Sequence, residues 1–334
     1  MNSLATYILR RLLLIPVTLF GITVVVFLIV RLAPGAQEGG GAVDGGGLDA
    51  AQRKAIEEAW RQKLHLDEPF HMQYVYWLRD MASTGLGFSH KHNRPVIELI
   101  AERLPVTLSL NLVAFAITYV IAVPLGMLSA VNHNRPFDRG ASVITFLLYS
   151  LPTIWVGTML LGYFANPAYP HLDYFPTNGL HAQEAGGYLF LRWAGDLLWH
   201  LVLPVITLSY AGFAYLSKQM RAGMLDTLRQ DYIRTARAKG LPGRAVVLRH
   251  ALRNSLLPVI TVLAAVLPAL IAGSVVVEKI FSIPGMGSLT YEAVTNRDFE
   301  VIQAVAAVAG LLNMTGLLLA DIAYAMVDPR ISYD

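Results

Sequence analysis

Long apolar intervals alternate with short polar connections along this chain. A helix needs about 20 apolar residues to cross the roughly 30 Å hydrocarbon core of a bilayer. Six intervals of about this length contain no Asp, Glu, Lys or Arg, and they cover residues 12–30, 104–131, 141–165, 197–217, 254–277 and 301–320. The pattern predicts an all-α membrane protein with six transmembrane helices. An even number of helices places both termini on one side.

The basic residues of the short connections indicate which side that is. One set of connections carries Arg10, Arg11, Arg135, Arg139, Lys218, Arg221, Arg229, Arg234, Arg237, Lys239, Arg244, Arg249, Arg253 and Arg330, whereas the opposite short loops carry Arg192, Lys279 and Arg297. Because cytoplasmic loops are enriched in Lys and Arg, the first side is predicted to be cytoplasmic, together with both termini. The apolar run of residues 12–30 exceeds the core of a signal peptide, so we interpret it as a retained span.

The polarity pattern also divides the chain into three parts. Residues 1–31 form an N-terminal transmembrane helix, residues 32–103 an external loop or cap, and residues 104–334 a five-helix core with a cytoplasmic loop at about 218–254. Within the cap, residues 39–47 are rich in glycine and predict a flexible excursion. Residues 48–64 are typical of a short amphipathic helix. Tyr74, Tyr76 and Trp77 suit a water–lipid boundary, and the cap is predicted to have no core of its own.

Composition agrees with a membrane protein and removes several other classes. Hydrophobic residues make up 55% of the 334 residues and charged residues 15%, with a mean hydropathy of +0.49. Soluble domains carry about 25% charged residues. The net charge of +3 is too small to indicate a nucleic-acid partner. Because the chain has no cysteine, disulfides, thiol catalysis and Cys-ligated metals are excluded.

The chain carries no catalytic motif. GxxxxGK[ST], HExxH and GxSxG are absent, so the chain has no phosphate-binding loop of its own. Its span interiors lack the charged residues that mark proton relays, which disfavours a proton-driven carrier. The spans also lack paired catalytic residues, which disfavours an intramembrane enzyme. Histidines at positions 65, 71, 90 and 92 lie in the external loop and are interpreted as solvated side chains. No catalytic or metal-binding residue is predicted.

An external segment, residues 278–300, contains a turn with specific chemistry. The run Ile283-Pro284-Gly285-Met286-Gly287 must turn sharply, because proline fixes its own φ and glycine permits positive φ. We expect this turn to bring the chain back toward the outer mouth of the bundle. An ordinary surface loop is the alternative.

The cytoplasmic segment of residues 231–258 is the most polar short connection. Good helix formers lead to Gly240, which can adopt the left-handed conformation that ends a helix. As a helix, Tyr232, Ala236 and Gly240 share one stripe, while cations at positions 234, 237 and 239 flank it. Such a stripe admits close approach of another protein. A basic helix lying on anionic headgroups remains an alternative.

Several stretches resemble one known family over nearly the whole chain. They are RTARAKG followed by RHALRNSLLPVIT, ILRRLLLIPVTLFGITVVVFLIVRLAPG, LHLDEPFHMQYVYWL with GLGFS, EKIFSIPGMGSL and DIAYAMVDPRISY. The chain thus resembles the B-type permease subunit of the dipeptide/oligopeptide/nickel ABC importer family. Gly240 matches the glycine of the general importer pattern, but Arg234-Thr235-Ala236 stands where Glu-Ala-Ala is usual.

The resemblance implies a type I ABC importer permease fold and a transport subunit without enzymatic activity of its own. It implies a bacterial or archaeal plasma (inner) membrane, a second (C-type) permease subunit, two cytoplasmic ATPase subunits and an extracytoplasmic substrate-binding protein. No cofactor is expected in this chain; ATP and Mg would be held by the partner subunits. Peptides or related small solutes are the expected substrates, and dipeptides, oligopeptides, nickel chelates and sugars stay open.

The same resemblance assigns two sets of residues. The ATPase-coupling residues would be Tyr232, Arg234, Thr235, Ala236, Arg237, Lys239 and Gly240, and the outer gate Pro284, Gly285 and Gly287. The alternative function is an autonomous secondary carrier or channel. That alternative predicts transport by the isolated chain without ATP.

Overall fold

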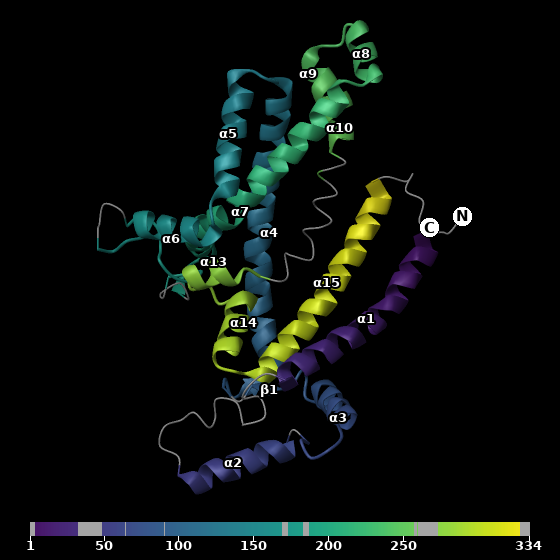
Figure 1. Ribbon diagram of the computed structural model, residues 1–334. Coiled ribbons are helices and arrows are strands. Elements are labelled where there is room, and N and C mark those ends of the chain that lie inside the picture. The colour runs from purple at the N-terminus through teal and green to yellow at the C-terminus, as the bar shows by residue number, and fades with distance from the viewer. Residues whose placement is uncertain are drawn as a thin grey trace.

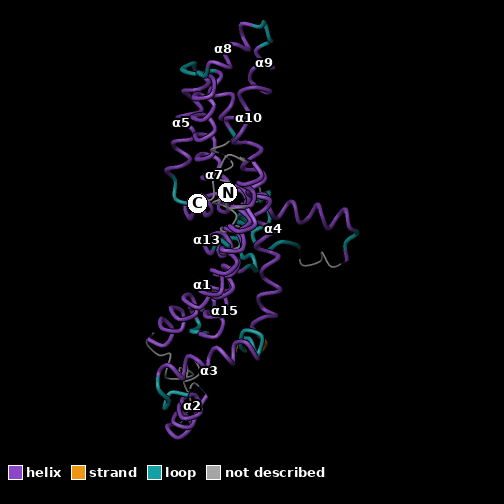
Figure 2. Tube along the Cα trace, turned by 90° about the vertical axis from the view of Figure 1, so that its right-hand side faces the viewer, coloured by secondary structure: helices purple, strands orange, loops and turns teal. Residues whose placement is uncertain are grey.

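The computed structural model describes residues 4–32, 49–63, 65–89, 91–168, 173–182, 187–256, 259 and 273–327. The described part is mostly helical and elongated (Figure 1). Helices α8 (Asp231–Ala238) and α9 (Gly243–Ala245) lie at one end, and α2 (Ala50–Lys63) and α3 (Phe70–Ser83) at the other. A view turned by 90° gives the same order along the long axis (Figure 2).

Four described helices are long and apolar enough to cross a membrane. They are α1 (Leu4–Leu32), α4 (Val96–Val131), α7 (Phe190–Leu228) and α15 (Phe299–Val327). Helices α5 (Pro136–Ser150) and α6 (Thr153–Phe164) form a bent pair, and if this pair counts as one span, the described residues contain up to five spans. The predicted fifth span, residues 254–277, lies mostly outside the described residues. The number six therefore stays a prediction.

The predicted third span is not one continuous helix. Helices α5 and α6 meet at 97°, at Leu151 and Pro152. A proline pushes the preceding residue out of the helical region and removes its own N–H, and Leu151 accordingly has ψ 133°. The hydroxyl of Tyr210 on α7 donates a hydrogen bond of 2.7 Å to the Leu151 carbonyl. A side chain from α7 thereby satisfies a backbone group at the break, whereas α4 continues as helix through Pro124.

Helices α4 and α7 pack against each other at the centre of the fold. A Cβ atom placed on Gly126 of α4 would lie 2.7 Å from the Cβ of Met220 on α7, so the two backbones approach closely. One buried core, which includes Ala122, Leu216, Met220 and Met224, lies on this crossing. Glycine is needed here for space, because a side chain would push the helices apart.

The predicted cap is joined to the bundle by aromatic packing. The predicted amphipathic helix is α2, and α3 was not predicted separately. Phe27 of α1 is buried against Tyr74 and Trp77 of α3, with ring centroids 5.4 and 5.5 Å away. Trp77 Nε1 also donates a 2.7 Å hydrogen bond to Gln303 Oε1 on α15. Tyr74 and Trp77 thus pack on the chain itself, and the buried contacts of α3 are shared with α1 and α15.

Short elements complete the described structure. Strands β1 (Phe88–Ser89) and β2 (Arg94–Pro95) pair antiparallel beside the cap. After α8 and α9 come a π-helical turn, η4 (Val246–Ala251), and α10 (Leu252–Ser255). Helices α13 (Val275–Ile280) and α14 (Met286–Thr295) precede α15. Helix α13 packs against α6 and helix α14 against α4, and the predicted outer turn lies between α13 and α14.

Candidate functional site

Helix α8 is held at the end of a helix that is longer than a bilayer is thick. The 39 residues of α7 span about 58 Å at a rise of 1.5 Å per residue, against roughly 30 Å of hydrocarbon. Helix α7 is therefore longer than a single crossing requires, and α8 follows its C-terminal end (Figure 1). A motion imposed on α8 has a direct route into the bundle.

The two faces of α8 differ sharply. Ile233 and Ala236, three residues apart, are 0% and 6% exposed and share the buried core with Met220, Met224 and Val246. The rest of the predicted coupling segment is exposed, namely Tyr232, Arg234, Thr235, Arg237, Lys239 and Gly240. One face thus anchors the helix on α7 and η4, and the other offers a basic surface.

The end of α8 confirms the structural role predicted for Gly240. Its φ is +74°, in the left-handed region that favours glycine. The N–H of Gly240 donates to the Arg237 carbonyl at 3.0 Å, and the N–H of Leu241 to the Ala236 carbonyl at 3.4 Å. This pair of bonds is a Schellman motif, which satisfies carbonyls that the helix leaves free.

Ala236 does not lie on the exposed stripe that the sequence predicted. Its Cβ points into the core because the helix uses the spacing of positions 233 and 236 to pack inward. Tyr232 is 41% exposed, and its hydroxyl accepts a 2.8 Å hydrogen bond from Asn254 Nδ2. The side chain of Arg234 is 76% exposed and pairs with Asp231 at 3.3 Å. The surface open to a partner is therefore polar and basic rather than lined by Ala236.

The predicted outer turn surrounds a buried carboxylate, Glu278. Its Oε1 accepts a 3.0 Å hydrogen bond from Thr107 Oγ1 on α4, and its Oε2 a 2.8 Å bond from the Ser288 N–H on α14. Thr107 Oγ1 in turn accepts from the Met286 N–H at 2.8 Å. Glu278 and Thr107 are both fully buried. One acidic side chain thus joins α4, α13 and the first turn of α14.

The charge on Glu278 is set by two opposing effects. Burial raises its pKa above the ordinary value of 4.5, because a carboxylate is poorly solvated away from water. Hydrogen bonds from Ser288, Thr107 and Gly287 favour the charged form and oppose the effect of burial. The start of α14 also favours negative charge, since its first N–H groups point toward the carboxylate.

The glycines of this turn are needed for space, not for positive φ as predicted. Gly285 has φ −110° and ψ −172°, an extended conformation that any residue adopts. A Cβ on Gly285 would lie 2.5 Å from Glu278 Oε2, and one on Gly287 2.7 Å from the Val275 nitrogen. Gly285 and Gly287 are buried, whereas Pro284 is exposed. The turn does fold back onto α4, as expected.

A third polar cluster, near α8, was not predicted. Asp138 on α5 is buried and pairs with Arg221 of α7, with 2.6 Å between Oδ1 and Nε. The sequence marks both residues only as charges in a basic loop. The one hint is that Asp138 is an acid between Arg135 and Arg139.

Two histidines of the predicted external loop, His65 and His92, have local partners. His65 stacks on Tyr76 with 4.3 Å between ring centroids, and His92 Nδ1 lies 3.0 Å from Ser89 Oγ. Within the described residues, no three His, Asp or Glu side chains come together as a metal site would require. His90 lies outside the described residues.

Comparison with known proteins gives a family and a fold. The family described as "Binding-protein-dependent transport system inner membrane component" matches residues 122–333, and its N-terminal counterpart matches residues 4–111. The oligopeptide transport system permease protein AppB of Bacillus subtilis (strain 168) is 39% identical over 333 residues, covering 99% of this chain and 100% of AppB. A putative peptide transport system permease protein of Brucella abortus (strain 2308) is 37% identical over 320 residues, 96% of each chain.

Among solved structures, a chain of the MetNI methionine ABC transporter, in inward facing conformations, is similar. The TM-score is 0.50 at 16% sequence identity, over 69% of this chain and 98% of that chain. At this identity the likeness concerns the fold alone.

The long apolar helices of the described residues define a membrane-embedded helical protein. The chain belongs to the family of binding-protein-dependent transport system inner membrane components. It is a permease subunit of an ABC importer, and the ATP-hydrolysing subunit is a different chain.

Proposed function

We propose that this chain is one half of the translocation path of an ATP-driven importer of peptides or related small solutes, and that α8 is where an ATPase subunit acts. The observation that carries the proposal is the two-faced α8, anchored by Ile233 and Ala236 and exposed through its basic face. The sequence offers no phosphate-binding loop, so the force must come from another chain. Peptides are favoured because the similar proteins are named as oligopeptide or peptide permeases.

The partners follow from this role. A second (C-type) permease completes the path, and two cytoplasmic ATPase subunits, each holding ATP and Mg, engage the coupling helices. An extracytoplasmic binding protein delivers the solute. Exposed cations at positions 234, 237 and 239 suit an acidic groove on the ATPase surface. The motion passes from α8 into α7 through the packed core, as rigid-body rocking between two arrangements of the bundle.

The proposed placement is a bacterial or archaeal plasma (inner) membrane, with α8 and both termini in the cytoplasm. The excess of Lys and Arg at this end supports it. Helices α1 and α15 both run from the cap toward the end of the molecule that carries α8, which supports a common side for the two termini (Figure 1). The buried turn at Glu278 and Gly285 lies on the other side of the α4 midpoint and serves as the outer gate.

Reconstitution in proteoliposomes tests the proposal. The complete complex receives a pool of peptides of two to five residues, with a nickel chelate and a sugar in parallel vesicles, and trapped solute is identified by mass spectrometry. We expect uptake of peptides only with ATP, Mg and both ATPase subunits. Transport of any of these solutes by the isolated chain without ATP would establish the secondary carrier instead. ATP-dependent uptake of only the chelate or the sugar would overturn the peptide assignment.

A further inference from the structure

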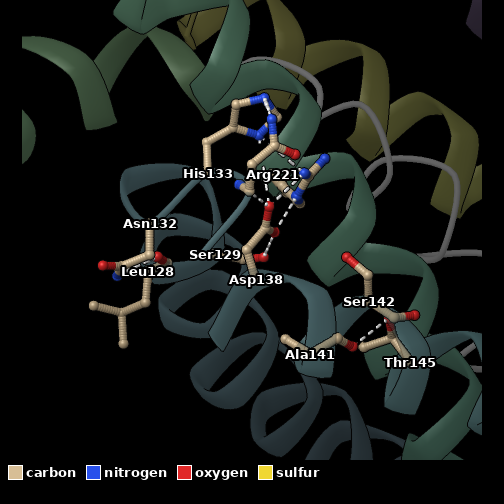
Figure 3. A network of polar contacts seen from close by, with 10 residues as sticks. Leu128, Ser129, Asn132, His133, Asp138, Ala141, Ser142, Thr145 and Arg221 are labelled. Carbon is tan, nitrogen blue, oxygen red and sulfur yellow. Dashed lines mark hydrogen bonds and ion pairs between the residues drawn. The ribbon is translucent and has the colours of Figure 1, made fainter. Parts of the chain in front are cut away.

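The carboxylate of Asp138 lies at the junction of four segments. Its Oδ1 accepts from Arg221 Nε at 2.6 Å and from Ser129 Oγ, and its Oδ2 accepts from Arg221 Nη2 at 2.8 Å and from the Asn134 N–H at 2.9 Å. Figure 3 shows Arg221 and Ser129 converging on the carboxylate of Asp138. Ser129 belongs to the end of α4, Asn134 to the following turn, Asp138 to the first turn of α5 and Arg221 to α7.

The geometry of this cluster is directional. Two parallel N–H···O bonds join Arg221 to Asp138, which fixes both the distance and the angle between α5 and α7. Asp138 is 2% exposed and all four of its acceptor positions are used. His133 Nδ1 also lies 3.2 Å from Arg221 Nη2. Buried ion pairs contribute little net stability, so fixing a relative position is a better account of such a site.

The cluster is adjacent to the anchor of α8. Met220 and Met224 of α7 are fully buried and share a core with Ile233 and Ala236 of α8. Arg221 directly follows Met220, so it projects about 100° away, toward α5. One face of the last turns of α7 thus contacts α8, and the adjacent face of α7 contacts the junction between α4 and α5. A displacement of α8 reaches α4 and α5 along this route.

We propose that Asp138 and Arg221 are positioning residues that make the end of α4, the start of α5 and the end of α7 move as one body when α8 is displaced. This inference rests on the proposed function. Flexible methionines transmit contact but tolerate sliding, whereas the bidentate pair resists it. Without the pair, the ATPase would still move α8, but α4 and α5 would follow incompletely.

The test separates positioning from folding by using a double variant. Arg221→Gln alone leaves a buried carboxylate unpaired and destabilises the chain. Asp138→Asn with Arg221→Gln removes both charges, so folding and assembly recover, but the bidentate pair is gone. The external Arg94→Gln variant is the control, since Arg94 pairs with Glu98 at 3.2 Å and Glu102 at 2.6 Å in an exposed setting.

The complete complex is reconstituted with the same peptide pool, and uptake per ATP hydrolysed is measured. Coupling between sites typically changes an equilibrium about 5–150-fold, so we expect uptake per ATP to fall about tenfold in the double variant, with assembly and ATP hydrolysis retained. Arg94→Gln should behave as the wild type. A double variant that assembles and transports with wild-type stoichiometry overturns the positioning role. Absence of ATP-dependent uptake in the wild type instead rejects the proposed function.

Discussion

Replacing Gly285 by alanine tests the packing of the outer turn. The backbone conformation accepts alanine, so the effect comes from space alone. The new Cβ would lie 2.5 Å from Glu278 Oε2, 2.6 Å from Glu278 Cδ and 2.6 Å from Thr107 Oγ1. Overpacking a core costs about 1–3 kcal/mol. Weakening the hydrogen bond between Thr107 and Glu278 adds about 1.5–3 kcal/mol to this loss of stability, the range for hydrogen bonds to charged groups. We therefore expect a loss of roughly 3–5 kcal/mol in the free energy of unfolding.

The assay is thermal unfolding of the purified complex at a fixed heating rate, because large membrane assemblies unfold irreversibly and the rate must be held constant. In soluble domains of 150–250 residues, 1 kcal/mol shifts Tm by about 2–4 °C, so in this larger chain a fall of roughly 5–10 °C is expected. Gly243→Ala is the matched control, since a Cβ there meets nothing within 4 Å. Equal melting temperatures for the two variants would refute the described packing around Glu278.

Three further predictions address other parts of the chain. Gly240→Val should retain ATP hydrolysis but lose most uptake, because the φ of +74° at position 240 costs a β-branched residue about 1–2 kcal/mol. Gly240→Asn should retain both ATP hydrolysis and uptake. Burial raises the pKa of Glu278, so the folded chain keeps the carboxyl proton to higher pH than the unfolded chain does. The free energy of unfolding should therefore decline as pH rises from about 4.5 through the folded pKa. Glu278→Gln should flatten this dependence of Tm on pH in melting scans, and an unchanged dependence would contradict the prediction. Trp77→Phe leaves Gln303 Oε1 without its donor and should lower stability by about 1–3 kcal/mol, which an unaltered Tm would disprove.

The apolar pattern predicted the helices well wherever burial in lipid alone decides them. Helices α1, α4, α7 and α15 each contain a predicted interval, and residues 231–238 form a helix, as predicted for that segment. The break at Leu151 was missed because both halves are equally apolar, and only the preference of a residue before proline signals it. Charge-free length does not distinguish a straight span from a bent pair.

The sites were predicted less completely because they depend on contacts far apart in sequence. Helical spacing placed Ala236 on an exposed stripe, but in the structure Ala236 belongs to the same buried core as Met220 and Val246. Gly285 was recognised as a special position for the wrong reason, since the need for space arises only when Glu278 folds back beside it. Asp138 pairs with Arg221 across 83 residues, and although an acid between Arg135 and Arg139 is unusual, the sequence does not indicate its partner.

Photo-cross-linking from α8 tests the central claim most directly. The chain has no cysteine, so Lys239→Cys introduces a unique attachment point for a benzophenone maleimide on the exposed face of α8. Lys91→Cys at the opposite end of the molecule is the control. In native membranes containing the complete complex, we predict a covalent product of this chain with the ATPase subunit from position 239 and none from position 91. Cross-links from position 239 to lipid alone would contradict the account.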